Sequence, residues 1–281
     1  MPTPDASVFA KRPWRLIEES DFAGALAVPT MLNWQQSQFY YWLGRDWARN
    51  WGVAVDLGCF AGGSTARLAA GLAASGSDAP VHAYDRFGAS DQAKSNVLYP
   101  AGIDPFDGED IRPLAERLLA PWSDRVHLHG GEITEQRWDG STIEILVMDA
   151  SKRPKTMDRM AQTFWPSIIS DRTIVVQPDV LHHKQPWVAT QMALWADHFE
   201  PVAWIGRSSV AYLCTRTPTP DKLRNRRVAG MDPARQERLL EKSVADMARF
   251  GADAAEAAER TLKTYLANPG VDMAWKMKDP E

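Results

Sequence analysis

The feature that most constrains this chain is a repeated alternation between short apolar runs and longer segments with helical spacing. The apolar runs predict strands at 52–58, 81–85, 125–131, 142–150 and 171–179, and the other segments predict helices at 62–76, 110–122, 155–170 and 185–199. The runs are apolar throughout and do not alternate with polar residues, which is typical of strands covered on both faces. The pattern therefore predicts an α/β fold with a doubly wound, mostly parallel sheet.

Two further apolar runs extend this sheet. They occupy residues 201–206 and 209–215 and lie close enough together to predict a terminal hairpin. The hairpin would complete a Rossmann-like, seven-stranded sheet with an antiparallel edge strand. Apolar residues at helical spacing within 33–50 predict an amphipathic helix before the sheet, and the polar, alanine-rich segment 232–267 predicts two helices after it.

Composition and charge narrow the class of protein. The 281 residues are 44% hydrophobic, which is enough for one large domain or two small ones. The net charge of −4 argues against a nucleic-acid-binding protein, and no apolar run approaches the roughly 20 residues of a membrane span. Cys59 and Cys214 lie in apolar surroundings that favour reduced thiols. We expect a cytoplasmic protein that binds neither nucleic acid nor membranes.

A glycine-containing turn follows the first predicted strand, in the stretch VDLGCFAGGST at 55–65. Gly58 permits a tight turn, and Gly62 and Gly63 allow a ligand to approach the backbone closely. The dinucleotide-binding fingerprint would require glycine at position 60 as well, where this chain has Phe60. A bulky ring there disfavours a pyrophosphate and makes a nicotinamide-dependent oxidoreductase the weaker alternative. A nucleoside without phosphate stays compatible with the turn.

Asp85 ends the second predicted strand. A carboxylate at this place in a doubly wound sheet accepts hydrogen bonds from ribose hydroxyls. The alternative is an ordinary α/β turn with an incidental acid nearby. Because the turn, the spacing and the acid agree, the sequence favours nucleoside binding.

With these residues in place, the sequence resembles motif I of the class I S-adenosylmethionine (SAM)-dependent methyltransferases over residues 50–215. The form acid-x-Gly-x-aromatic-x-Gly-x-Ser/Thr is similar to that of catechol and caffeoyl-CoA O-methyltransferases and of macrocin-type sugar O-methyltransferases. The resemblance implies that Asp56 fixes the amino-acid end of SAM and that Ser64 or Thr65 caps the helix or touches the SAM carboxylate. It implies further SAM-binding residues at Gly58, Cys59, Phe60, Gly62, Asp85, Arg86, Glu132 and Asp149.

Three of these residues receive specific roles. Asp85 would hold the ribose, and Arg86 would lie beside the adenine. The segment HLHGGEI at 127–133 resembles the one whose acid binds the adenine amino group, which would make Glu132 that acid. A solvated loop acid is the alternative for Glu132.

The resemblance also implies a reactive end. In VMDASK, at 147–152, Asp149 would bind magnesium and Lys152 would act as general base. The next strand end departs from the family pattern, since VVQPDVLHH supplies Gln177 and Pro178, or Pro178 and Asp179, where an acidic pair is expected. Proline has no side-chain ligand, so a magnesium ion held by Asp149 and Asp179 becomes doubtful.

His182 follows this departure, and a histidine base there would need no metal. A solvated or helix-capping histidine pair, His182 and His183, is the alternative.

Together these patterns predict a SAM-dependent methyltransferase that methylates a hydroxyl of a small molecule, such as a sugar or a natural-product intermediate. The predicted parts are a helical lid or cap at 1–50, a SAM-binding domain at 51–216 and a helical extension at 217–281. The lid and the insertion at 87–109 would form much of the acceptor pocket. A non-catalytic cofactor-binding module is the alternative, and the acceptor's identity and a homo-oligomeric state are left open.

Overall fold

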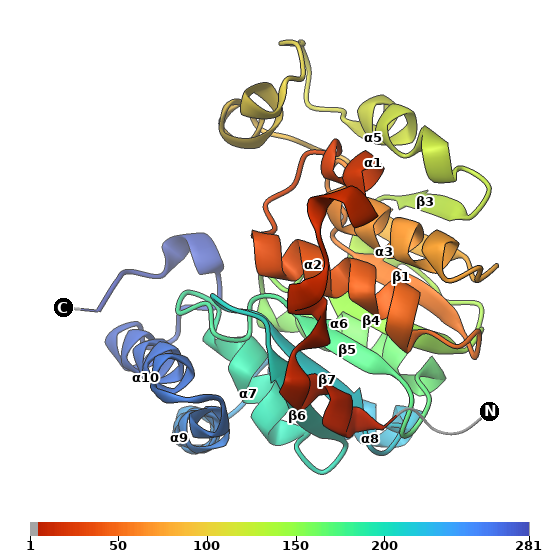
Figure 1. The fold of residues 1–281 in the computed structure, drawn as a ribbon. Helices are drawn as coiled ribbons and strands as arrows, with labels where there is room; N and C mark the ends of the chain where they lie inside the picture. The colour runs from red at the N-terminus through yellow and green to blue at the C-terminus, as the bar shows by residue number, and fades with distance from the viewer. Residues whose placement is uncertain (1–4, 281) are drawn as a thin grey trace. The chain divides into compact units, whose positions relative to one another are not determined.

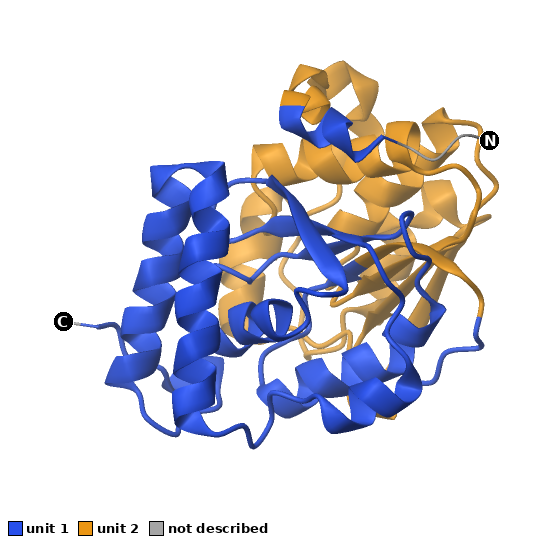
Figure 2. Cartoon of the chain, turned by 90° about the horizontal axis from the view of Figure 1, so that it is seen from below, with its two compact units in different colours: residues 1–10, 137–140, 147–281 blue, residues 11–136, 141–146 orange. Residues whose placement is uncertain are grey.

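The computed structural model describes residues 5–280 (Figure 1). The predicted segments 1–50 and 217–281 therefore include residues, 1–4 and 281, that lie outside the described part. The chain forms two compact units, which Figure 2 distinguishes by colour. Unit 1 comprises residues 1–10, 137–140 and 147–281, and unit 2 comprises residues 11–136 and 141–146.

Within residues 5–280, seven strands form one sheet in the order β3-β2-β1-β4-β5-β7-β6 (Figure 1). The strands are β1 Val53–Leu57, β2 Val81–Asp85, β3 Val126–Gly130, β4 Ile143–Met148, β5 Ile174–Gln177, β6 Phe199–Trp204 and β7 Val210–Cys214. β2 pairs in parallel with both β1 and β3, whereas β7 is antiparallel to both β5 and β6. The predicted seven-stranded sheet with an antiparallel edge is thus confirmed, with β6 as the outermost strand of the closing hairpin.

The helices of unit 2 are α1 Ala23–Leu26, α2 Trp34–Trp42, α3 Gly63–Ala74, α4 Asp91–Ala93 and α5 Arg112–Leu118, with a π-helical turn at Leu43–Trp47 after α2. α2 begins in a reciprocal cap: Asn33 Oδ1 accepts the Gln36 N–H, and Gln36 Oε1 accepts the Asn33 N–H. Residues 36–42 are all buried, so the prediction of an amphipathic helix is wrong here. The reason is that the preceding segment covers the expected outer face, with Trp14 against Trp42 and Phe22 against Tyr41.

Arg67, on α3, ties this preceding segment to the sheet-covering helix. Its buried guanidinium donates to the carbonyl oxygens of Ala25, Val28 and Gly63 and to Ser37 Oγ, at 2.8–3.3 Å. Burial without a carboxylate partner lowers the pKa of Arg67 to about 10. These four hydrogen bonds of the buried Arg67 guanidinium therefore all go to neutral oxygen atoms.

The insertion at 87–109 is folded. It contains α4 and short helical turns at Lys94–Leu98 and Tyr99–Ala101, and an antiparallel bridge between Gly88 and Asp110 closes its two ends. Phe87, Leu98 and Ile111 are buried together in one apolar cluster.

The helices of unit 1 are α6 Pro154–Phe164, α7 Pro186–Leu194, α8 Pro220–Asn225, α9 Pro233–Met247 and α10 Ala252–Ala267. α9 and α10 confirm the two helices predicted within 232–267, and both pack against α7, which is buried along its whole length. The final segment folds back on α10, because the Asn268 side chain exchanges hydrogen bonds with the backbone of Lys278. Among residues 5–280, no helix combines the length and the apolarity that crossing a membrane requires.

Candidate functional site

The turn after β1 and the end of β2 meet at Asp85. Parallel pairing sets Leu57 opposite Tyr84, so Asp85 follows at the level of the turn. Its Oδ2 accepts the N–H of Phe60 at 2.9 Å, and its Oδ1 accepts the N–H of Phe87 at 2.7 Å. An ionised carboxylate has about four lone-pair positions, so each oxygen retains the capacity to accept a further donor. The sequence predicts that the turn and this acid lie at the same ligand site, and the structure brings them into direct contact.

Phe60 has a left-handed backbone, with φ of 51°. This conformation is costly for a bulky residue and is usually found at glycine. The hydrogen bond to Asp85 and packing of the ring against the apolar cluster of the insertion hold Phe60 there. Position 60 therefore takes the kind of backbone conformation for which glycine is suited, and the side chain alone distinguishes it from the dinucleotide fingerprint.

Asp56 is fully buried, and its carboxylate organises the first turn of α3. Its Oδ2 accepts the hydroxyls of Ser64 and Thr65, each at 2.6 Å. Burial raises the pKa of Asp56 to about 6; the two hydroxyls oppose the rise, and the charge of Asp85 adds to it. α3 has Gly62 at its N-cap position and no side-chain cap, so the prediction that Ser64 or Thr65 caps the helix is wrong. Both hydroxyls are already committed to Asp56.

The glycines of the turn make room for other parts of the same chain. A Cβ on Gly62, whose φ is 98°, would lie 2.7 Å from Leu119 Cδ1, and one on Gly63 would lie 2.5 Å from the carbonyl oxygen of Pro29. The packing of the chain itself therefore needs glycine at these two positions, and a role of Gly62 in SAM binding stays a prediction. Cys59 is also buried, and burial raises the pKa of its thiol well above the usual value.

Arg86 and Glu132 are brought together by the pairing of β2 with β3, in which Asp85 lies opposite Gly130. Arg86 Nη1 lies 3.6 Å from Glu132 Oε1, and both side chains are more than half exposed. The two residues assigned to the adenine thus form one exposed ion pair beside Asp85. Their roles toward adenine stay predictions.

In unit 1, Asp149 and Asp179 converge on Lys152. The Lys152 ammonium lies 2.7 Å from Asp179 Oδ2 and 3.4 Å from Asp149 Oδ1. Burial lowers the pKa of Lys152, but the two carboxylates outweigh it and hold the pKa above its usual value. A lysine in this position keeps its proton at neutral pH, which argues against Lys152 as the general base. Gln185 Nε2 donates to the same Asp179 oxygen at 2.6 Å, a contact with no signal in the sequence.

These residues do not fit a magnesium ion. Gln177 is buried, and its amide lies 3.5 Å from the sulfur atoms of Met148 and Met192. The carbonyl of Pro178 accepts the hydroxyls of Ser208 and Ser209. Neither register of the expected acidic pair therefore supplies two ligands, and no group of three His, Cys, Asp or Glu side chains in the described chain is placed to hold a metal ion. The two carboxylates that remain, Asp149 and Asp179, are bonded to the Lys152 ammonium.

His182 is half-buried, and burial lowers its pKa, which keeps it uncharged at neutral pH. Its Nδ1 accepts the N–H of Lys184 at 3.3 Å. His183 stacks on it with ring centroids 5.4 Å apart and pairs through Nε2 with Asp279 Oδ1 at 2.7 Å. His183 is thus not simply solvated; it belongs to an ion-pair group with Lys184, Arg260 and Asp279.

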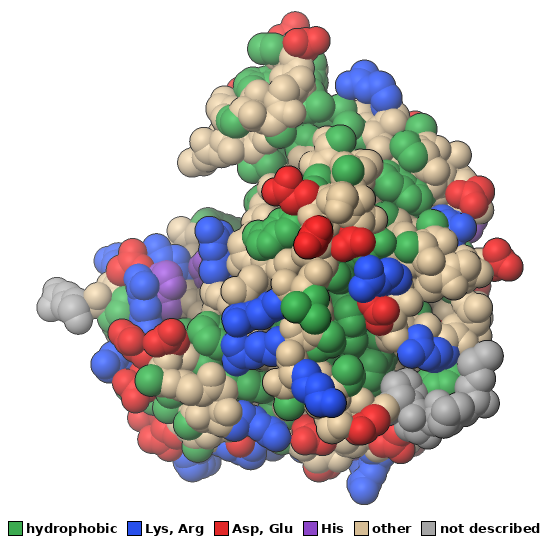
Figure 3. Space-filling view, viewed as in Figure 1, with side chains coloured by type: hydrophobic (Ala, Val, Ile, Leu, Met, Phe, Trp, Pro, Cys, Tyr) green, Lys and Arg blue, Asp and Glu red, His purple; other side chains and the backbone are tan. Residues whose placement is uncertain are grey.

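Figure 3 shows basic, acidic and histidine side chains gathered near the C-terminal end of the chain. No sequence pattern indicates the Asp279 contact, since 96 residues separate Asp279 from His183.

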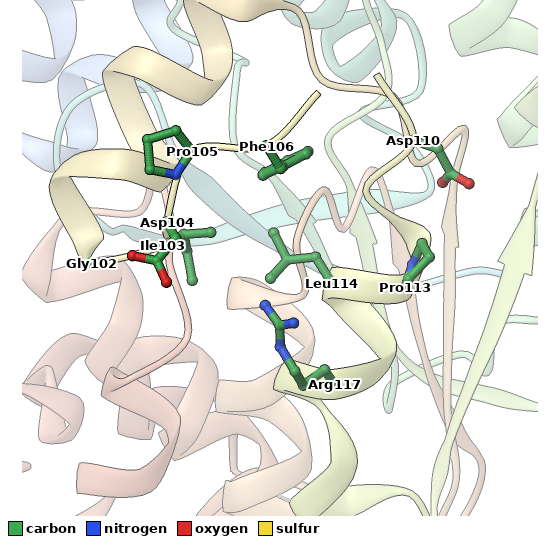
Figure 4. A pocket seen from close by; sticks show the side chains of 9 residues that line it. All are labelled: Gly102, Ile103, Asp104, Pro105, Phe106, Asp110, Pro113, Leu114 and Arg117. Atoms are coloured by element: carbon green, nitrogen blue, oxygen red, sulfur yellow. The ribbon is translucent and has the colours of Figure 1, made fainter. Parts of the chain in front are cut away.

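A cavity of about 390 Å³ lies within unit 2, lined by the insertion and by α5 (Figure 4). Its apolar walls include Ile103, Phe106 and Leu114, and Arg117 lines it from α5. None of the predicted SAM-binding residues is among the lining residues. The prediction that the insertion contributes to an acceptor pocket stays a prediction.

No protein-family model matches this sequence, and none of the curated proteins matches it by sequence. Among solved structures, the O-methyltransferase NovP is similar to 66% of this chain over 82% of its own, with 18% identity and a TM-score of 0.50. The pyocyanin biosynthetic protein PhzM is 14% identical over 62% of this chain and 52% of its own, with a TM-score of 0.38. The SAH-bound methyltransferase PaMTH1 of Podospora anserina is 12% identical over 96% of this chain and 82% of its own, also at 0.38.

The fold assignment rests on the strand order, the antiparallel closing hairpin and the similarity to NovP. The described chain has a Rossmann-like fold, similar to that of the O-methyltransferase NovP.

Proposed function

We propose that this protein is a SAM-dependent methyltransferase that transfers a methyl group to a hydroxyl oxygen of a small molecule. The observation that carries the proposal is the contact between Asp85 and the backbone of the turn after β1. It joins the two sequence features from which nucleoside binding is predicted. The similarity of the fold to that of NovP, an O-methyltransferase by name, supports oxygen as the accepting atom.

Asp85 suits a ribose. Each carboxylate oxygen already holds one backbone N–H, from Phe60 or Phe87, and retains one lone pair for a hydroxyl. Two hydroxyls on adjacent carbons match two oxygens on one carboxylate. Arg86 and Glu132 would face the adenine, and Asp56 would position the first turn of α3 for the methionine end.

The residues of unit 1 supply the acceptor chemistry in this proposal. Methyl transfer breaks the C–S bond of the sulfonium and forms a C–O bond, and the acceptor must lose its hydroxyl proton. His182 is the proposed acceptor of that proton because burial keeps it uncharged, whereas Lys152 already carries a proton. In the recorded contact Nδ1 is an acceptor, so neutral His182 carries its proton on Nε2. Proton uptake then takes place at Nδ1, with loss of the long contact to the Lys184 N–H.

Calorimetry with S-adenosylhomocysteine (SAH) tests the proposal. We expect wild-type protein to bind SAH and Asp85→Ala to bind it at least about 100-fold more weakly, because hydrogen bonds to a charged group contribute about 1.5–3 kcal/mol each. Asp78→Ala is the matched control: Asp78 is exposed and precedes β2, at the opposite end of the strand from Asp85. Circular dichroism of each variant checks that the loss of the Phe60 contact leaves the fold intact.

Two results would count against the proposal. Absence of SAM and SAH binding by the wild-type protein would overturn it. Binding without SAH release, across a panel of hydroxylated small molecules supplied with SAM, would favour the non-catalytic module.

A further inference from the structure

At the strand ends of unit 1, a positive charge is supplied by a side chain, the ammonium of Lys152. We propose that the Lys152 ammonium takes the place of a divalent metal ion between Asp149 and Asp179, so that the acceptor hydroxyl is bound by an N–H of Lys152 without a metal. The acceptor class that follows is a hydroxylated molecule that needs no second oxygen to chelate an ion. The acceptor part of this inference rests on the proposed function; the cation part does not.

The contacts of Asp179 support the substitution. Two N–H donors already point at its Oδ2, from Lys152 at 2.7 Å and from Gln185 at 2.6 Å. A metal ion bound to this oxygen would have to displace a positive ammonium and an amide donor together. Asp179 is only 16% exposed in its side chain, so these donors occupy a sheltered position.

The loop that carries Lys152 is held in place. Its backbone turns tightly, with the Lys152 N–H donated to the carbonyl of Ala150 at 2.9 Å. The carbonyl of the intervening Ser151 accepts the indole N–H of the buried Trp187 at 2.6 Å. These two bonds fold the lysine back over Asp149, so the ammonium is positioned by the chain rather than by chance at a surface.

The ammonium retains a donor for a substrate. Lys152 has three N–H bonds, and the two carboxylates account for two of them. Its side chain is 49% exposed, which leaves the third N–H accessible. A donor placed there would stabilise the negative charge that develops on an acceptor oxygen as it loses its proton.

Titration with Mn²⁺, followed by electron paramagnetic resonance, tests the inference without SAM or an acceptor. We expect wild-type protein and the Lys155→Ala control to bind no Mn²⁺ at concentrations up to about 1 mM, in the range of weak carboxylate sites. Lys152→Ala should gain one site that binds at least about tenfold more tightly than any in the wild type. The double variant Lys152→Ala/Asp179→Asn should lose it again.

Two outcomes of the titration would overturn the inference: a wild-type Mn²⁺ site that Asp179→Asn abolishes, or a folded Lys152→Ala variant that gains no site. The wild-type titration needs no variant, so it decides the first point even if Lys152→Ala does not fold. A protein that binds no SAH but shows the expected Mn²⁺ pattern would refute the proposed function and leave the built-in cation standing. Turnover that EDTA abolishes and Mg²⁺ restores would refute the built-in cation and leave the proposed function standing.

Discussion

The strand ends of the two units hold their carboxylates by different means. In unit 2, Asp56 accepts two hydroxyls and Asp85 accepts two backbone N–H groups, and all four donors are neutral. In unit 1, Asp149 and Asp179 share the ammonium of Lys152. Neutral donors stabilise a charge without cancelling it, whereas an ion pair largely cancels it.

This difference indicates what each unit is suited to bind. Unit 2 keeps its negative charges, which favours a ligand with hydroxyl donors and a positive sulfonium, as SAM has. Unit 1 presents a carboxylate pair whose charge is partly neutralised, together with a donor on Lys152. The following predictions test how much the neutral hydrogen-bonding groups of unit 2 contribute to the free energy of unfolding.

The largest expected effect is on stability and comes from Arg67→Met. This cation, like the carboxylates of unit 2, is held by neutral groups, and its removal leaves three carbonyls and the Ser37 hydroxyl without that donor. We expect the free energy of unfolding to fall by about 3 kcal/mol or more, since hydrogen bonds of a charged group contribute about 1.5–3 kcal/mol each; the Ala25 carbonyl keeps the Val28 N–H and is not left unpaired. Urea denaturation of both proteins measures it.

Arg117→Met is the control for Arg67→Met. Arg117 lies on α5, where it is exposed, and its replacement should change stability by no more than about 0.5 kcal/mol. A loss below 1 kcal/mol for Arg67→Met would mean that the neutral contacts around the guanidinium contribute little.

The second prediction concerns the pH dependence of Asp56. Its pKa of about 6 in the folded protein exceeds the ordinary value of 3.8, so the folded state binds the proton more tightly than the unfolded state. Wild-type protein should therefore lose stability relative to Asp56→Asn as pH rises from about 4 to about 6. The total loss is about 3 kcal/mol, and the difference should stay constant above pH 6.

Urea unfolding of wild type and Asp56→Asn at pH 4, 5, 6 and 7 measures this difference. Asp78→Asn, at an exposed acid, should track the wild type at every pH. If the gap between wild type and Asp56→Asn does not change with pH, the two hydroxyls of Ser64 and Thr65 fully compensate the burial of Asp56.

Much of the fold could be predicted because strand and helix periodicities are local properties of the sequence. The strand positions, the closing hairpin and the helices α9 and α10 follow from runs of a few to a dozen or so residues. The meeting of the turn at 58–62 with Asp85 was also predictable, since parallel strands end at the same edge. The buried outer face of α2 was not, because the residues that cover it precede it and have no regular pattern.

The candidate site was less predictable because its contacts join residues distant in sequence. The resemblance implies a general base at Lys152, but the bond of Lys152 to Asp179 depends on how two loops fold. The contacts of Gln185 with Asp179 and of Asp279 with His183 depend on the same loops and on the segment that follows α10. Ser64 and Thr65 show the limit most clearly: both suit a helix start, yet the buried Asp56 takes their hydroxyls.

The smallest expected effect comes from Glu132→Gln, which breaks a charged pair in unit 2. Arg86 and Glu132 are the charged pair in unit 2 that lies beside Asp85, and both side chains are largely exposed. An exposed pair contributes at most about 1 kcal/mol, so stability should change by no more than about that amount. If Glu132 accepts the adenine amino group, SAH affinity should fall by roughly three- to tenfold, because an amide oxygen is a weaker acceptor than a carboxylate. Calorimetry should show the same fall in SAH affinity on Glu132→Gln when Arg86 has been replaced by alanine. Unchanged affinity in Glu132→Gln would make Glu132 a solvated loop acid and restrict nucleoside recognition to Asp85 and the turn.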